Sequence, residues 1–205
     1  MLRPLIDNRE ALPNQPAIRA QLRQATAALH VEIEQALDLT GLSMARYRLL
    51  LETFYGFHAP VEARLASAVA APGFAWPARA ALLEQDLLAL GAEASFIAQL
   101  PRCGDLPLLE SEGHRAGCLY VLEGACLGGQ VIARGLHQRH GLGPATGSAF
   151  FTGEGAGTAA RFRQVIQWIE GLARDGADPE EIVHSACETF RALLGWARNR
   201  RVALA

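Results

Sequence analysis

The sequence predicts a single all-α domain. Apolar residues recur three and four positions apart through most of the chain, which is the spacing that places them on one face of a helix. No stretch alternates apolar and polar residues over the length of a strand, and no internal repeat is present. The chain has 205 residues, half of them hydrophobic, which is enough to bury one substantial core.

The chain is expected to begin with an irregular segment over residues 1–15, because prolines such as Pro4 and Pro13 interrupt it. The helical domain is then expected to span residues 16–205. Its first helix is predicted over residues 16–38 and ends before Gly41. The apolar residues that recur at helical spacing there are Ile18, Leu22, Ala25, Leu29, Ile33 and Leu37.

The second helix is expected to follow Ser43, whose hydroxyl can cap it. Pro60 is expected to kink this helix or to break it. A short helix is predicted over residues 78–90, ended by Gly91, and a further short amphipathic piece over residues 95–100. The residues of the second helix expected to point inward are Tyr47, Leu50, Leu51, Phe54, Phe57 and Val61.

The second half of the chain contains three more predicted helices, over residues 108–140, 158–172 and 179–200. Pro179 suits the first position of the last one. Between the first two, residues 141–157 hold six of the 20 glycines in the chain, so we expect a loop there. The total is about seven or eight helices.

The composition excludes several classes of protein. Lys and Arg total 19 against 21 Asp and Glu, which does not suit a nucleic-acid binder. None of the four cysteines lies in a Cys-x-x-Cys pair, and the N-terminus lacks the long apolar core of a signal peptide. We therefore expect reduced thiols and a cytoplasmic protein. Because Glu123 and Gln130 interrupt the apolar run over residues 117–133, it is expected to be a buried helix and not a membrane span.

In the middle of the predicted helix over residues 108–140, the stretch over residues 119–132 carries three glycines, Gly124, Gly128 and Gly129. Each glycine in a helix interior costs about 1 kcal/mol relative to alanine. Gly124 and Gly128 are four residues apart and share one face, which is therefore open to a close neighbour. That neighbour is either another helix packed through small residues or a large planar ligand, and spacing alone favours neither.

His30 is the histidine with the most informative neighbours. Glu34 lies one helical turn later and can accept a hydrogen bond from one ring nitrogen, while the other nitrogen binds a metal. Arg23 lies two turns earlier on the same face, where it could meet an acidic group of a ligand. The alternative is a solvated histidine–glutamate pair on a surface helix, which spacing alone favours. No nucleophile elbow, phosphate loop or dinucleotide fingerprint supports a hydrolase or an NTPase.

Together these segments resemble the haem oxygenase family. The stretch from Leu22 to Glu34 is similar to the proximal helix of that family, with a basic residue, Ala-Thr, His and then Glu. The Gly-Gly-Gln at residues 128–130 is similar to the end of its distal helix. Two further segments, at residues 150–152 and 161–164, are similar to a third family segment at matching spacing. The resemblance spans residues 20–198 and is greatest to bacterial members that supply biliverdin to bacterial phytochromes.

The resemblance implies an all-α fold that holds haem between a proximal and a distal helix. It implies that His30 is the iron ligand and that Glu34 fixes its ring. It further implies that Arg23 and Arg163 meet the haem propionates and that Phe190 lines the pocket. Gly124, Gly128 and Gly129 would be the catalytic segment of the distal helix. Haem would be both cofactor and substrate, so the protein itself need supply no nucleophile.

The resemblance also implies an activity and its partners. The protein would cleave haem with O₂ to biliverdin, CO and ferrous iron. An external reductase or ferredoxin would supply electrons, because the sequence has no flavin or iron–sulfur motif. Ala125 stands where many members carry an aspartate that orders water, and Gln167 stands at an often basic position. The alternatives are a non-catalytic haem carrier or sensor on the same fold, or a helical protein with another small-molecule pocket.

Overall fold

A computed structural model of the protein describes residues 17–39, 41–67 and 78–202. These residues are all-α, with no strand among them, which confirms the predicted fold class. The irregular segment predicted at residues 1–15 lies outside the described residues. The helices are α1 (Ile18–Leu37), α2 (Met44–Ala66), α3 (Arg79–Ala89), α4 (Ala94–Ala98), α5 (Glu112–His140), α6 (Ala149–Thr152), α7 (Thr158–Arg174) and α8 (Pro179–Val202).

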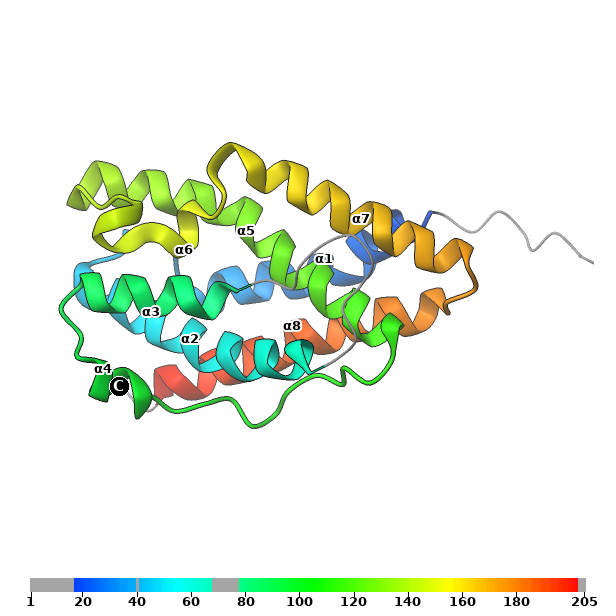
Figure 1. The fold of residues 1–205 in the computed structure, drawn as a ribbon, viewed down its shortest axis with the longest axis horizontal. Coiled ribbons are helices and arrows are strands. Elements are labelled where there is room, and N and C mark those ends of the chain that lie inside the picture. The colour runs from blue at the N-terminus through cyan, green and yellow to red at the C-terminus, as the bar shows by residue number, and fades with distance from the viewer. Residues whose placement is uncertain (1–16, 40, 68–77, 203–205) are drawn as a thin grey trace, which may run out of the picture.

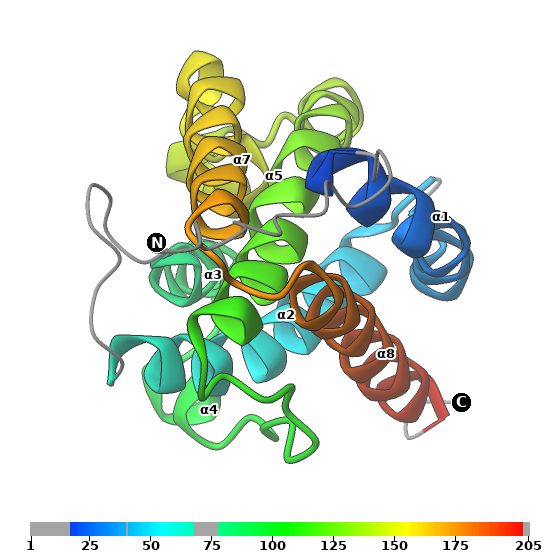
Figure 2. The same ribbon diagram turned by 90° about the vertical axis from the view of Figure 1, so that its right-hand side faces the viewer.

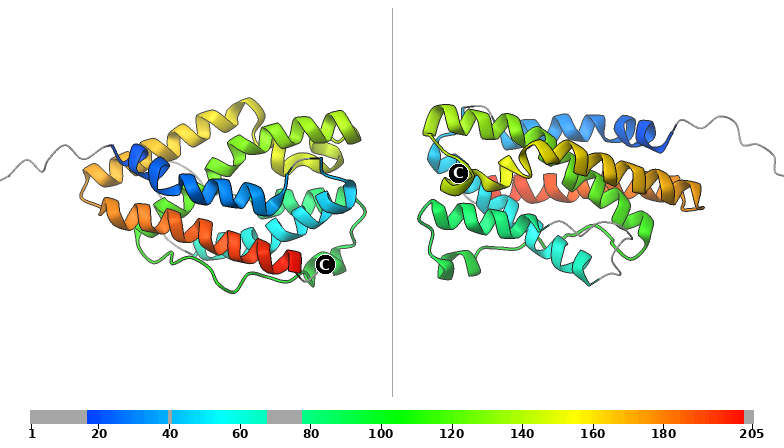
Figure 3. Two further views of the ribbon diagram at one scale, coloured as in Figure 1. Left: turned by 180° about the vertical axis from the view of Figure 1, so that it is seen from behind. Right: turned by 45° about the horizontal axis from the view of Figure 1, so that its top comes forward.

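The long helices lie along one axis of the molecule. In Figure 1, α1, α5 and α8 run in the same direction along this axis, and α7 runs back in the opposite direction. The view along the axis in Figure 2 shows α1 and α5 on neighbouring sides of α8. Both helices contact mainly α8 and not each other, while α7 packs on α5. The two further views in Figure 3 show the same arrangement, with α2 and α3 completing the fold.

Local signals set the ends of the helices largely where the sequence predicts them. The Ser43 hydroxyl accepts a hydrogen bond from the N–H of Arg46 at 3.3 Å and starts α2. The start of α5 differs from the prediction, because Ser111 caps it and the helix begins at Glu112. Gly141, with a φ of 68°, ends α5 in the left-handed conformation that glycine adopts without strain.

The expected kink or break at Pro60 does not end α2, which continues to Ala66. Proline has no N–H to donate to the carbonyl four residues earlier, here that of Gly56. That carbonyl accepts instead the N–H of Cys103 at 2.9 Å. A distant segment therefore satisfies the group that Pro60 leaves free, and the helix passes through the proline.

The prediction of a loop over residues 141–157 is wrong in part. The segment contains a π-helical turn at Pro144–Ser148, the short helix α6 and a 3₁₀ turn at Gly155–Gly157. The buried Asp86 of α3 accepts the N–H groups of Ala149 at 2.6 Å and Phe150 at 2.9 Å. The Tyr47 hydroxyl of α2 donates to the Gly147 carbonyl at 2.6 Å. Polar side chains from α2 and α3 thus order a segment in which local propensity predicts a loop.

The helix α5 is the one helix of the described residues that is long and apolar enough to cross a membrane. Half of its most apolar window is buried inside the protein. Its Glu123 is 1% exposed and is paired with arginines, as described below. These contacts are those of a core helix, in agreement with the interpretation of the sequence.

At Gly117 the backbone of α5 lies very close to the backbone of α8. A Cβ atom at this position would overlap the Ile182 carbonyl oxygen and lie 2.6 Å from the Ala186 nitrogen. Both neighbours are backbone atoms of α8, so neither can move aside like a side chain. Only glycine allows the two helices to approach this closely, and the contact sets how α5 lies on α8.

We predict that Gly117→Ala destabilises the protein by about 1–3 kcal/mol, because it overpacks the α5–α8 contact. The matched control is Gly195→Ala in α8, where an added Cβ meets no atom within 4 Å. It should be neutral or stabilising by up to about 1 kcal/mol. Urea unfolding of both variants measures the difference. Equal stability of the two variants would contradict the close contact.

Candidate functional site

The exposed side of α1 carries the residues that the sequence predicts for an iron site. The Nδ1 atom of His30 lies 3.4 Å from a carboxylate oxygen of Glu34, and their side chains are 57% and 59% exposed. When Nδ1–H points to this carboxylate, Nε2 keeps its lone pair free for a ligand. The structure therefore brings the predicted pair together in an arrangement that suits an axial histidine.

The ring of Phe190 contacts the imidazole of His30. Phe190 belongs to α8, is 7% exposed, and its ring centre is 6.0 Å from that of His30 at an interplanar angle of 65°. This edge-to-face contact limits how the imidazole can tilt. A residue predicted to line the pocket thus lies directly against the predicted iron ligand, although 160 residues separate them in the chain.

The three glycines of α5 that the sequence singles out differ in their surroundings. Gly124 and Gly128 share one face of the helix, which we call the glycine face. A Cβ atom added at Gly128 would meet no atom within 4 Å, and one at Gly124 would meet only the Phe162 ring, at 3.6 Å. Next to them, Leu127 and Val131 are exposed apolar residues. On α1, Val31 is exposed beside His30. Of the two helices that rest on α8, α1 therefore presents an apolar side chain, and α5 presents apolar side chains and open backbone, which suit a flat apolar ligand.

Gly129 differs from the other two glycines. It is buried, and a Cβ atom there would lie 3.2 Å from the Phe151 carbonyl oxygen and 3.3 Å from the Phe151 ring. These contacts favour the helix-packing interpretation for Gly129. Of the two explanations that the sequence leaves open for the glycines, close packing therefore suits one position and an open face suits the others.

The predicted propionate partners are exposed. Arg23 on α1 and Arg163 on α7 form no ion pair within the described part of the chain. Gln167 is also exposed, one helical turn after Arg163. Cations without an acidic partner remain available for carboxylates of a ligand. Their role in holding haem remains a prediction.

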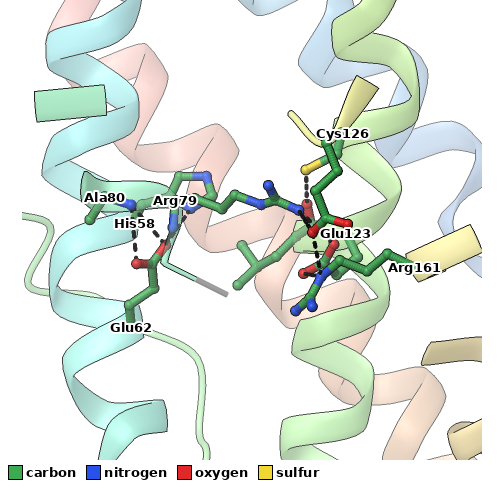
Figure 4. A network of polar contacts seen from close by, with 9 residues as sticks. His58, Glu62, Arg79, Ala80, Glu123, Cys126 and Arg161 are labelled. Carbon is green, nitrogen blue, oxygen red and sulfur yellow. Dashed lines mark hydrogen bonds and ion pairs between the residues drawn. The ribbon is translucent and has the colours of Figure 1, made fainter. Parts of the chain in front are cut away.

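Behind the glycine face lies a buried ion network that the sequence analysis did not predict. Glu123 accepts hydrogen bonds from Arg79 of α3 at 3.0 Å and from Arg161 of α7 at 2.8 Å. Glu154 lies 3.8 Å from Arg79 and 3.6 Å from Arg161. Figure 4 shows the two arginines meeting Glu123 on α5. Arg161 is therefore largely buried in this network.

The charges of this network are balanced, with two guanidinium groups and two carboxylates. Burial disfavours the charge on Arg79, but Glu123 and Glu154 raise its pKa above the ordinary value. Burial raises the pKa of the Cys126 thiol beside them to about 11, so the thiol is neutral at physiological pH. One sequence signal could have indicated the network, because a glutamate inside an apolar helix requires a buried cation.

All four cysteines are buried and free. Burial raises the pKa of Cys118 to about 12, which makes this thiol unreactive. Within the described residues no group of three or more His, Cys, Asp or Glu side chains could hold a metal ion.

The comparison with family models decides what kind of protein this is. The model of the heme oxygenase family matches residues 17–199. The chain belongs to the haem oxygenase family. No curated protein and no solved structure matches it. The match covers every α-helix from α1 to α7 and most of α8, so the helices that carry His30 and the glycine face both lie within the haem oxygenase region.

We predict that Gly128→Ala raises the free energy of unfolding of the ligand-free protein by up to about 1 kcal/mol, because alanine is the better helix former and the site is open. Gly129→Ala is the matched comparison. There the gain in helix propensity should be offset by the close contact with Phe151. Urea unfolding distinguishes the two. A loss of stability in Gly128→Ala would contradict the open glycine face.

Proposed function

We propose that this protein is an active haem oxygenase that converts haem and O₂ to biliverdin, CO and ferrous iron. The observation that carries the proposal is the combination of an exposed His30–Glu34 pair on α1 with an open glycine face on α5, in a chain that belongs to the family. Neither feature alone suffices, because surface histidine pairs and helix glycines are both common.

In this proposal each residue has a distinct role. His30 holds the haem iron through Nε2, and Glu34 keeps the imidazole in the required tautomer and orientation. Phe190 supports the ring from α8 and keeps water from that side. Arg23 and Arg163 pair with the propionates and thereby set the rotation of the macrocycle. The haem, once bound, supplies the redox chemistry with O₂.

The distal side includes open backbone of α5. Gly124 and Gly128 leave room for the macrocycle to lie close to α5, and Gly129 holds α5 against α6. Ala125 is exposed, so protons would reach the site from solvent through ordered water and not from a side chain at that position. The chain therefore binds, orients and hydrates its substrate without a titrating group of its own at that position.

The partners follow from this chemistry. The sequence contains no flavin or iron–sulfur motif, so a reductase or a ferredoxin supplies the electrons. We place the reaction in the cytoplasm, where the buried thiols stay reduced. A bacterial phytochrome is the recipient of biliverdin that we propose.

We predict that His30→Ala abolishes the haem absorption spectrum of the wild-type complex and stops biliverdin formation, and that added imidazole partly restores both. The matched control is His184→Ala, which changes an exposed histidine of α8. Haemin titration, followed by addition of a reductase and NADPH, measures both effects. If His30→Ala binds haem with an unchanged spectrum, another residue is the iron ligand.

A second candidate function is a non-catalytic haem carrier or sensor, and Ala125 is the observation that favours it. We predict that the wild-type protein nevertheless forms biliverdin when a suitable donor is present. Ala125→Asp should change the rate of turnover, because it adds a carboxylate that orders water. If the wild type binds haem but only Ala125→Asp opens the ring, the protein is a carrier or sensor and not an enzyme.

A further inference from the structure

We propose that Glu123 is a positioning residue. Through its pairing with Arg79 and Arg161, it sets where the glycine face of α5 lies in the protein. The inference rests on the proposed function in one respect: the glycine face is where the substrate lies. The position of that face in the protein is a property of the chain itself, and it can be measured without substrate.

The glycine segment lies between two anchored positions of α5. At its start, Glu123 is held by Arg79 at 3.0 Å and by Arg161 at 2.8 Å. At its end, the Gln130 amide donates to the Gly155 carbonyl at 2.6 Å. Residues 124–128 between these anchors include Gly124, where an added Cβ atom would meet only the Phe162 ring, and Gly128, where it would meet no atom within 4 Å. The segment is therefore fixed at both ends, with an open position at Gly128 between them.

Both anchors attach to the side of α5 that faces away from Gly128. Glu123 and Gln130 are seven residues apart, which is about two turns, so they lie on the same side of the helix. Gly128 follows Glu123 by five residues, which places it about 140° around the helix. A change at the anchors would thus move the glycine face toward or away from its ligand without touching it.

The network is itself held in place from α2. The Glu62 carboxylate accepts the N–H of Arg79 and of Ala80, each at 3.1 Å. Nδ1 of His58 lies 3.2 Å from the same carboxylate. The start of α3 is therefore tied to α2, and the Arg79 side chain extends from this tied end to Glu123, as Figure 4 shows. The length of the Arg79 side chain therefore limits where Glu123 can lie.

An ionic contact restricts the position of a helix more than an apolar contact does. A buried carboxylate is stable only where cations and hydrogen-bond donors surround it. The helix α5 is therefore held in the one position in which Glu123 reaches both arginines. An apolar contact would tolerate small shifts of the helix. Ala125 provides no carboxylate on the exposed side, so backbone and apolar side chains form the distal surface, and the anchors decide where that surface lies.

The test is Glu123→Gln, which keeps the size of the side chain and removes its charge. The matched control is Glu188→Gln, which removes an exposed glutamate from its pair with Arg191 on α8. We expect amide hydrogen exchange at residues 125–128 of the ligand-free protein to accelerate by about tenfold or more in Glu123→Gln. The control should match the wild type.

A second measurement uses the ferric haem complex. If Glu123 positions the distal backbone, the environment of the bound haem would change with it, so the pH of the acid–alkaline spectral transition should shift by about half a pH unit or more in Glu123→Gln. A purely structural role would lower the melting temperature and leave this transition unchanged. Unchanged exchange at residues 125–128 together with an unchanged transition would overturn the proposal.

If Glu123→Gln does not fold, Glu154→Gln decides. Glu154 is 47% exposed and lies farther from both arginines, so its loss should accelerate exchange at residues 125–128 in the same direction but less. Wild-type exchange rates in that variant would overturn the proposal. If the wild-type protein binds no haem, the proposed function fails, while the exchange experiment still decides whether Glu123 positions the segment.

Discussion

The architecture depends on α5 being packed closely on one side and left bare on another. At Gly117 the helix lies against the backbone of α8, and at Gly129 it lies against the backbone of α6. Between these contacts, Gly124 and Gly128 expose backbone instead of side chains. Glycine serves two opposite purposes within the same helix, because a residue without a side chain allows either a close helix neighbour or an open surface.

The long helix α8 connects the two halves of the candidate site. It supports α1 through Phe190, which contacts His30, and it supports α5 at Gly117. Since α1 and α5 make their main contacts with α8, the space between the proposed iron ligand and the glycine face is set by a helix that belongs to neither. A small change in how α8 packs would therefore change both sides of the site at once.

The buried charges lie behind the site and not in it. Glu123, Arg79 and Arg161 form a hydrogen-bonded ion network on the packed side of α5, whereas His30, Arg23 and Arg163 are exposed. Buried ion pairs contribute little net stability, because desolvation offsets their attraction, but they allow few alternative arrangements. The network is therefore better explained by the position that it imposes on α5 than by the stability that it adds.

The sequence by itself determined the helices and the candidate pair on α1. Helical spacing, the Ser43 cap and Gly141 act within a few residues, so their effects can be predicted without a fold. The His30–Glu34 contact is likewise local, being one turn of a single helix. The family resemblance added Phe190 and Arg163, which no local pattern could have connected to His30.

Only the tertiary structure decided the rest. The order in residues 144–157 depends on Asp86 and Tyr47, the continuity of α2 at Pro60 depends on Cys103, and the partners of Glu123 lie 44 and 38 residues away. It also separated Gly128 from Gly129, adjacent residues that the sequence treats alike. Each outcome depends on which atoms meet across the fold, because a carboxylate, a carbonyl or a bare backbone has no effect until its partner is placed beside it.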